Sequence, residues 1–220
     1  MIQTTITLQQ FMQALQDTLV MVVVSLVVGA IIGIFLGVSV VVTRPDGVLE
    51  NRWFYRAVNP IINVIRSLPF IILLVAIIPF TRMVVHTTIG TPAAIVPLIV
   101  FIAPYIGRLV ENSLLEVDPG ILEAANAMGA SPWQVIWHFL LPEALGSLIL
   151  SLTTATIGLI GATAMAGTVG GGGIGDLAIS YGYERFDTFT MIITVVLLIL
   201  VVQVVQSLGN FLAAKARRIG

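Results

Sequence analysis

The longest apolar run in the sequence, residues 18–42, restricts most strongly what this chain can fold into. It contains no charged residue, and a helix of this length, rising about 1.5 Å per residue, crosses the roughly 30 Å hydrocarbon core of a bilayer. Backbone polar groups in hydrocarbon must be paired within the segment itself, so the run predicts a membrane-spanning α-helix. The whole chain agrees, because 58% of its residues are hydrophobic and only 10% are charged.

Four further apolar runs predict an all-α integral membrane protein with five transmembrane helices, in one domain over residues 1–220. The predicted spans are 18–42, 60–80, 92–109, 144–166 and 189–212. Residues 4–17 mix polar and apolar side chains at helical spacing, which predicts a separate short helix lying at the membrane interface. Residues 43–59 are expected to form a loop. Pro69 should interrupt the second span, because proline cannot donate a backbone hydrogen bond.

A small residue recurs at every fourth position of the first span. The series is Ser25, Gly29, Gly33 and Gly37. Such a stripe lets two helix backbones approach closely. The sequence leaves open whether the partner helix belongs to the same subunit or to a second copy of the chain.

The basic residues predict the orientation in the membrane. Five spans place the two termini on opposite sides. With the C-terminus inside, most basic residues fall on the cytoplasmic side, where such residues concentrate, and only Arg82 and Arg185 fall outside. The inner group is Arg44, Arg52, Arg56, Arg66, Arg108, Lys215, Arg217 and Arg218. We therefore expect the N-terminus outside and the loop 111–143 in the cytoplasm.

The loop 111–143 contains signals for two short helices separated by a glycine. Asp118 can cap the first helix with Pro119 at its first position, and Gly129 can close it in the left-handed conformation. Ser131 can cap a second helix that runs to about Leu141, before Pro142. A stiff pair of helices on the cytoplasmic side suggests a docking element for a soluble partner.

This loop resembles the EAA loop of binding-protein-dependent ABC importer permeases. The matching residues are Glu123, Ala124, Ala125, Gly129, Leu141 and Pro142, with Phe139 where the family usually has isoleucine. The resemblance implies a type I importer permease whose coupling helices dock on an ATPase. The residues it assigns to that contact are Ile121, Leu122, Glu123, Ala124, Ala125, Met128, Gly129, Leu141 and Pro142.

Glu123 is the one charged member of this set. We place it in the first turn of a capped helix, where the helix dipole favours a negative charge. We therefore expect it to orient the loop or its partner, rather than to act as a general base. Ala124 and Ala125 are small enough to leave room for a close approach to a partner's groove.

The sequence offers little for catalysis or metal binding. It lacks a phosphate-binding G-x-x-x-x-G-K-[ST] loop, its only lysine is Lys215, and it has no cysteine. His86 and His138 lie far apart without companion ligands, and no nucleophile–base set is present. We expect no enzyme activity, no metal, no cofactor on this chain and no nucleic-acid partner. The glycine run from Gly170 to Gly175 follows no strand, so we interpret it as a tight, exposed reversal on the outer side that could touch a partner.

The resemblance extends over nearly the whole chain to the permeases of bacterial methionine importers. The segments that show it are Thr43–Pro45, Arg66–Leu74, Ile78–Arg82, Val110–Asn112, Ala127–Ala130, Leu141–Ala144 and Tyr181–Tyr183. It implies import of methionine, both D- and L-, across a bacterial inner membrane. It also implies an ATPase dimer that binds ATP and Mg²⁺, and a methionine-binding lipoprotein outside. Five spans enclose little space for a solute, so we expect a homodimer with the pathway on its two-fold axis.

Few features of the sequence indicate which residues line the solute pathway. The span 144–166 is the most polar of the five and our best candidate to line it. Tyr105, Thr163 and Met165 are our candidate pathway residues, because a mostly apolar lining with these side chains would suit an uncharged amphipathic solute. Serine and threonine hydroxyls, however, also bond to carbonyls of their own helix. A permease for another amino acid or small metabolite remains the alternative. A self-contained secondary transporter is less favoured, since spans one, four and five hold no ionisable residue, and a membrane-embedded enzyme lacks a catalytic cluster.

Overall fold

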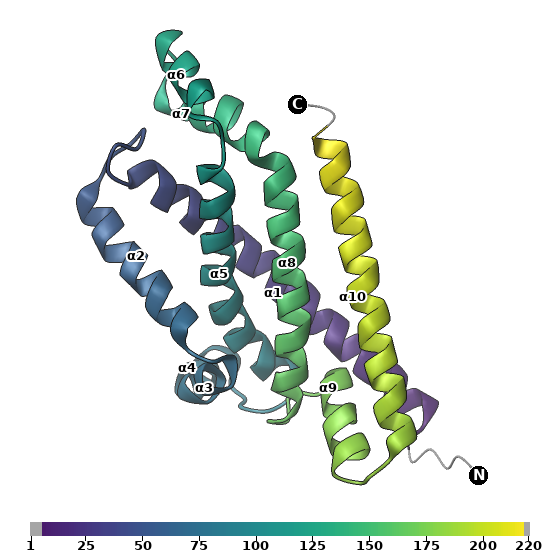
Figure 1. Ribbon diagram of the computed structural model, residues 1–220. Helices are drawn as coiled ribbons and strands as arrows, with labels where there is room; N and C mark the ends of the chain where they lie inside the picture. The colour runs from purple at the N-terminus through teal and green to yellow at the C-terminus, as the bar shows by residue number, and fades with distance from the viewer. Residues whose placement is uncertain (1–5, 218–220) are drawn as a thin grey trace. The chain divides into compact units, whose positions relative to one another are not determined.

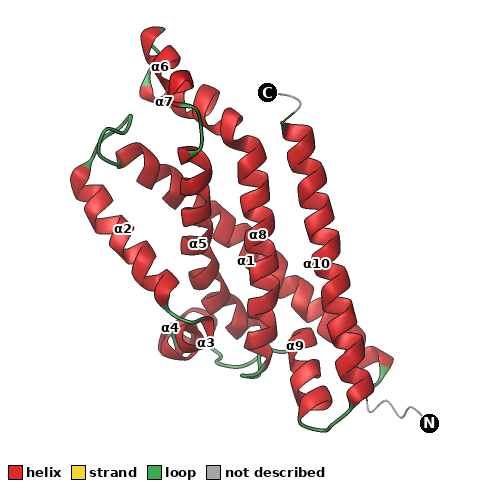
Figure 2. Ribbon diagram, in the orientation of Figure 1, coloured by secondary structure: helices red, strands yellow, loops and turns green. Residues whose placement is uncertain are grey.

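Helices account for nearly all of the fold. The computed structural model describes residues 6–217, and within that range it contains helices and loops but no strand (Figures 1 and 2). Four helices are long and apolar enough to cross a membrane. They are α1 (Leu8–Thr43), α5 (Thr91–Leu115), α8 (Leu141–Gly167, extended at its start to Pro132) and α10 (Thr188–Ala216). The predicted all-helical membrane fold is confirmed.

The second predicted span differs from its expected form. Helix α2 (Arg52–Ser67) begins eight residues before Pro60, and a break at Leu68 and Pro69 separates it from α3 (Phe70–Ala76) and α4 (Ile78–Val85). Pro69 has extended backbone angles, and the helix pair α2 and α3 is bent by 106° there. The predicted interruption at Pro69 is confirmed, but the predicted start near Pro60 was wrong, because α2 already begins at Arg52. The pair counts as a fifth span only if both arms are taken together.

Side-chain caps explain two helix starts that the apolar pattern misplaced. The Asn51 side-chain oxygen accepts a hydrogen bond from Phe54 N at 3.1 Å, which caps α2 and shortens the predicted loop 43–59. Thr7 and Gln10 form a reciprocal pair of side-chain to backbone bonds at 2.9 and 3.2 Å, which starts α1 at Leu8. The separate interfacial helix was therefore wrong for residues 8–17, which are the first turns of α1. Residues 1–5 lie outside the described part.

The short loop between α1 and α2 is polar and exposed. The Arg52 guanidinium donates to Glu50, and the backbone N–H of Asp46 donates to the same carboxylate. The pKa of Glu50 lies below its ordinary value. The hydrogen bond from Arg52 has the larger effect, and the bond from Asp46 N–H has the next largest. Both groups are solvent-exposed, so this pair adds little to stability.

Contacts divide the chain into two compact units. One gathers the residues up to Gly29, Leu68–Ile102 and Thr156–Val205, and the other gathers Ala30–Ser67, Ala103–Ala155 and the residues from Gln206 onward. The four long helices each contribute residues to both units. The small helices α9 (Gly173–Leu177) and the π-helix η2 (Ala178–Tyr183) belong to the first unit. The segment from α6 (Pro119–Ala127) to the start of α8 belongs to the second.

The small-residue stripe of the first span packs inside this chain. A Cβ on Gly37 would lie 2.5 Å from the carbonyl oxygen of Gly107, and one on Gly33 would lie 2.6 Å from that of Ala103. Helices α1 and α5 are therefore in backbone contact in the second unit. Of the two alternatives left open, the structure supports packing within one subunit for Gly33 and Gly37.

Replacing Gly37 by leucine should separate α1 from α5. The new side chain meets backbone at less than van der Waals distance, and backbone cannot move aside as a flexible side chain can. We expect a destabilisation of about 1–3 kcal/mol or more, measured as a lower midpoint of thermal unfolding in mild detergent. Gly161→Leu is the matched control, because a Cβ there has no neighbour within 4 Å. Equal loss in both variants would contradict the close contact.

Candidate coupling segment

We name residues 119–140, from α6 to the π-helix η1 (Val135–Leu140), the candidate coupling segment. Its first helix is fixed at its start by a side chain. The Asp118 Oδ1 accepts a hydrogen bond from Gly120 N at 2.7 Å, and Pro119 occupies the first helical position of α6. Proline is suited to that place because its missing N–H would have no helical partner. The predicted start of this helix is confirmed.

Gly129 ends the same helix in the left-handed conformation, with φ of 73°. Gly129 N donates to Asn126 O at 3.0 Å, and Ala130 N donates to Ala125 O at 3.1 Å. These two bonds make a Schellman motif, which satisfies the last carbonyls of the helix and reverses the chain direction. The predicted role of Gly129 in closing α6 is confirmed.

The second helix begins with a capping box. Ser131 Oγ accepts from Gln134 N at 3.4 Å, and Gln134 Oε1 accepts from Ser131 N at 2.8 Å. Helix α7 (Pro132–Gln134) then passes without a gap into the π-helix η1 (Val135–Leu140) and into α8. Figure 1 shows α6 and α7 folded beside each other ahead of α8.

The predicted end of this second helix at Pro142 was wrong, and so was the predicted extent of the loop, 111–143. Helix α5 runs on to Leu115, and α8 already begins at Leu141. Leu141 N donates to Ile136 O, five residues back, so the hydrogen-bond register has already shifted in the wide turn before Pro142. The proline, which cannot donate, is thereby accommodated in a continuous helix.

Packing within the segment explains why it can be stiff. Ala125 is completely buried, and so are Val135 and Ile136 of η1, because α6 folds back against η1. We had expected Ala125 to leave room for a partner's groove, but its side chain is buried and serves internal packing. Ala124 and Glu123 are exposed, while Ile121, Leu122 and Leu141 are half-buried.

The outer face of the segment combines apolar and polar side chains and contains a cleft. Met128 is 68% exposed and lies at the edge of a cleft of about 440 Å³. The cleft is lined by Met128, Gly129, Ala130, Gln134, His138 and Phe139. An exposed methionine beside such a cleft is typical of a surface that adapts to a partner.

We expected Glu123 in the first turn of its helix, but the structure places it further along. Glu123 is the fifth residue of α6, and the first turn of that helix holds no acidic residue. Since the effect of the helix dipole falls off within the first turn, the dipole does not favour this charge. The carboxylate is exposed, which leaves it accessible to a partner chain.

The three candidate pathway residues do not form one cluster that the structure defines. Tyr105 belongs to the second unit, whereas Thr163 and Met165 belong to the first. Thr163 is buried, and its hydroxyl donates to Ile160 O of its own helix at 2.7 Å. Met165 is 51% exposed. Their role in the pathway stays a prediction.

The glycine run is not the exposed reversal that we expected. Gly171, Gly173 and Gly175 are buried, and Ile174 N donates to Thr18 Oγ1 of α1 at 2.8 Å. The run also meets the loop before α5, where Gly90 N donates to Gly170 O at 2.8 Å. Its residues after Gly172 form α9 and pack into the first unit.

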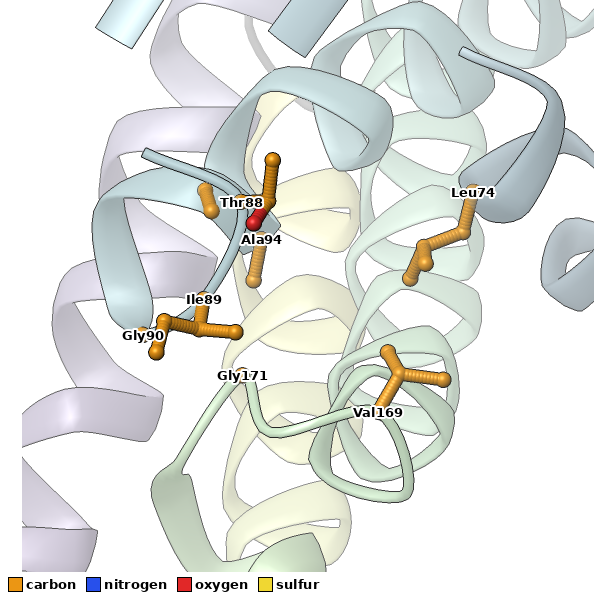
Figure 3. Close-up of a pocket in the computed structure, with 8 residues that line it drawn as sticks. Leu74, Thr88, Ile89, Gly90, Ala94, Val169 and Gly171 are labelled. Atoms are coloured by element: carbon orange, nitrogen blue, oxygen red, sulfur yellow. The ribbon is translucent and has the colours of Figure 1, made fainter. Parts of the chain in front are cut away.

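Figure 3 shows the hollow where these two loops meet, with Ile89 and Gly90 on one loop and Val169 and Gly171 on the other. Its volume of about 20 Å³ is enough for roughly one water molecule. The hollow is therefore a packing gap and is too small for an organic solute.

One polar cluster was missed by sequence reasoning. On α5, Arg108 donates to Glu111 Oε2 at 2.5 Å. It also donates to the side-chain oxygens of Asn59 and Asn63 on α2, each at 2.6 Å. The side chains of Arg108 and Glu111 are only 17% and 10% exposed. The spacing of Arg108 and Glu111 by three residues on one helix was a signal that could have been noticed.

The described residues thus form an all-helical chain with several helices long enough to span a membrane and one segment with two capped short helices. The description "Binding-protein-dependent transport system inner membrane component" belongs to a family model that matches residues 29–218. The chain belongs to this family. It is an inner-membrane component of a transport system rather than an enzyme, and the interpretation as an ABC importer permease is confirmed.

Two relatives that are described as D-methionine transport permeases are similar to this chain. The probable D-methionine transport system permease protein MetI of Vibrio cholerae is 49% identical over 173 residues, which cover 79% of this chain and 77% of that protein. The D-methionine transport system permease protein MetI of Escherichia coli K12 is 53% identical over 130 residues, or 59% of this chain and 60% of that protein.

Solved structures agree with this comparison. The inward-facing MetNI methionine ABC transporter contains a chain with 43% identity and a TM-score of 0.93, covering 97% of this chain and 99% of that one. A structure of an amino acid ABC transporter with histidines matches at 19% identity with a TM-score of 0.77 over 94% of each chain. The latter likeness shows the fold alone.

Proposed function

We propose that this chain is the permease subunit of an ATP-driven importer that carries methionine, both D- and L-, across a bacterial inner membrane. The observation that carries the proposal is the doubly capped segment with the exposed side chain of Met128 beside a cleft. Glu123 and Gly129 occupy the places of the importer-loop pattern within it. The relatives at about half identity, which are described as D-methionine permeases, support the choice of substrate.

The proposed assembly is a homodimer of this chain with two copies of an ATPase, which binds ATP and Mg²⁺, on the cytoplasmic side. An extracytoplasmic methionine-binding lipoprotein delivers the solute. The N-terminus lies outside and the C-terminus inside. Ile121, Leu122, Glu123, Ala124, Met128 and Gly129 face or shape the ATPase contact, while Ala125, Leu141 and Pro142 hold the segment in place. The solute passes Tyr105, Thr163 and Met165.

In this mechanism the coupling segment moves as one body. Closure of the ATPase dimer displaces α6, and the Schellman turn and capping box keep α6 fixed relative to η1. Because η1 continues into α8, the displacement reaches the membrane without a flexible joint between them. Nucleotide chemistry takes place on the partner chain, and this chain converts the movement into alternating access.

Met128→Glu should weaken binding of the ATPase. A charge at the exposed position of Met128 would have to be desolvated on docking, so we expect a loss of roughly tenfold or more, equal to about 1.4 kcal/mol. The measurement is the amount of ATPase that copurifies with the tagged permease in mild detergent. Asn126→Glu adds the same charge at an exposed position outside the cleft lining, and should bind normally. Unchanged copurification for Met128→Glu would remove this face from the contact.

Substrate class is tested separately by uptake. Proteoliposomes that contain the permease, its ATPase and its binding protein should accumulate labelled D- and L-methionine only when ATP is present. Uptake of another amino acid or small metabolite, with methionine ignored, would identify a different importer of the same class. Uptake by the lone permease without an ATPase would contradict the proposed function altogether.

A further inference from the structure

Helix α2 has two faces of opposite character. Its arginines and asparagines fall at positions i, i+4, i+7, i+11 and i+14, which is one narrow stripe along a helix of 3.6 residues per turn. They are Arg52, Arg56, Asn59, Asn63 and Arg66. The opposite face is apolar, and Ile61 and Val64 on it are 58% and 61% exposed. In a chain that spans a membrane, exposed aliphatic side chains face lipid.

Hydrogen bonds fix the direction of the polar stripe. Arg108 of α5 holds the side-chain oxygens of Asn59 and Asn63, which are four residues apart and therefore adjacent on the stripe. The stripe is thus turned towards α5 and away from the face of Ile61 and Val64. Asn63 nevertheless keeps an exposed side chain, so this polar surface is open on one side in a single copy of the chain.

The charge of this surface is strongly positive. Arg44 and Arg66 lie near enough to Glu111 to interact with it electrostatically, and Arg108 contacts it directly. Three positive charges, on Arg44, Arg66 and Arg108, thus act on the one negative charge of Glu111, and Arg56 lies on the same stripe. The Arg108 Nε is also buried without a hydrogen-bond partner among the described residues. Ionisable side chains of a membrane protein that face other helices and not lipid mark solute pathways.

We propose that the polar stripe of α2, together with the Arg108–Glu111 pair, lines an aqueous passage for a solute that bears a carboxylate. The arginines attract the carboxylate, and Glu111 supplies a negative charge for the positive end of a zwitterion. A second copy of the chain closes the open side of the stripe. The proposal rests on the importer function proposed above, and it places the charged part of the pathway on α2 rather than on α8.

The chain is well suited to a direct test because its sequence contains no cysteine. Single cysteines are introduced on the stripe as Arg56→Cys and Asn63→Cys, and on the opposite face as Ile61→Cys and Val64→Cys. Each variant, assembled with its ATPase in membrane vesicles, is treated with a small water-soluble thiosulfonate reagent. We expect labelling of the stripe positions and at least roughly tenfold slower labelling of the opposite face, which lipid shields from a charged reagent.

A second arm tests enclosure. A passage admits a small reagent but excludes a maleimide attached to a large polymer, whereas an open membrane surface admits both. Asn126→Cys on exposed α6 is the control that both reagents should reach in the absence of ATPase. If the polymer reagent labels Asn63→Cys as fast as Asn126→Cys, α2 lies on the bilayer surface and the passage is overturned.

A third arm tests charge. With rates normalised to a free thiol, an anionic thiosulfonate should modify Asn63→Cys about tenfold faster than a cationic one at low salt, because positive surfaces concentrate anions. The difference should shrink at high salt, where screening is stronger. Equal rates for the two reagents would overturn the carboxylate preference. Labelling needs no transport, so these outcomes are independent of whether methionine is the substrate and whether the ATPase docks at Met128.

Discussion

Replacing Gly129 by proline should abolish ATP-driven uptake while the chain still inserts into the membrane. Proline fixes φ near −65°, whereas Gly129 has φ of 73°, and proline also removes the bond from Gly129 N to Asn126 O. Proline at a position whose φ it cannot adopt destabilises a protein by more than about 1 kcal/mol, so we expect that α6 can no longer fold back on η1. Uptake in proteoliposomes and the ATPase rate of the complex are the measurements.

The control for this variant is Gly129→Asn. A Cβ at Gly129 has no neighbour within 4 Å, so the only obstacle to a side chain is the backbone conformation, which asparagine adopts at a small cost. Most of the uptake should therefore remain. Normal uptake in Gly129→Pro would refute the role of this turn in coupling, and equal loss in both variants would point to the side chain instead of the backbone.

Replacing Arg108 by methionine should produce the largest loss of stability. Glu111 would then be a largely buried carboxylate without its direct partner, and breaking a buried pair in this way costs about 3–5 kcal/mol. Asn59 and Asn63 would also lose the donor that ties α2 to α5. The measurement is thermal unfolding of the purified chain in mild detergent.

The double variant Arg108→Met with Glu111→Leu tests whether the unpaired charge of Glu111 causes the loss of stability. Removing both charges together leaves no unpaired ion, so stability should recover much of the loss. A double variant as unstable as Arg108→Met alone would show that the asparagine bonds, and not the ion pair, hold the two helices. A stable single variant would contradict the burial of the pair.

The long helices could be predicted from the sequence because apolar length alone determines them. The run that became α1 and the run that became α10 each allow only one regular structure in a bilayer. The ends were less predictable, because they depend on single polar side chains such as Asn51 and Gln10. Helix α2 was partly missed for a related reason. Its polar face resembles a loop when the sequence is scanned for apolar spans, and Pro60 appeared to mark a helix start.

The coupling segment was predicted well where local chemistry decides the structure, at Asp118, Gly129 and Ser131. It was predicted poorly where packing decides. The burial of Ala125 follows from α6 folding back on η1, and no local pattern indicates this. The glycine run was misjudged in the same way, because its contact with Thr18 joins residues far apart in the chain.

The π-helix η1 has a consequence for how the protein can change over evolutionary time. A π turn contains one more residue than the α-helical turn it replaces, and one residue corresponds to a rotation of about 100° along a helix. The single extra residue between Ser131 and Leu141 therefore sets which side of α8 is aligned with the outer face of α6. Loss or gain of one residue there would rotate α8 about its axis relative to α6. The caps at Asp118 and Ser131 would remain unchanged.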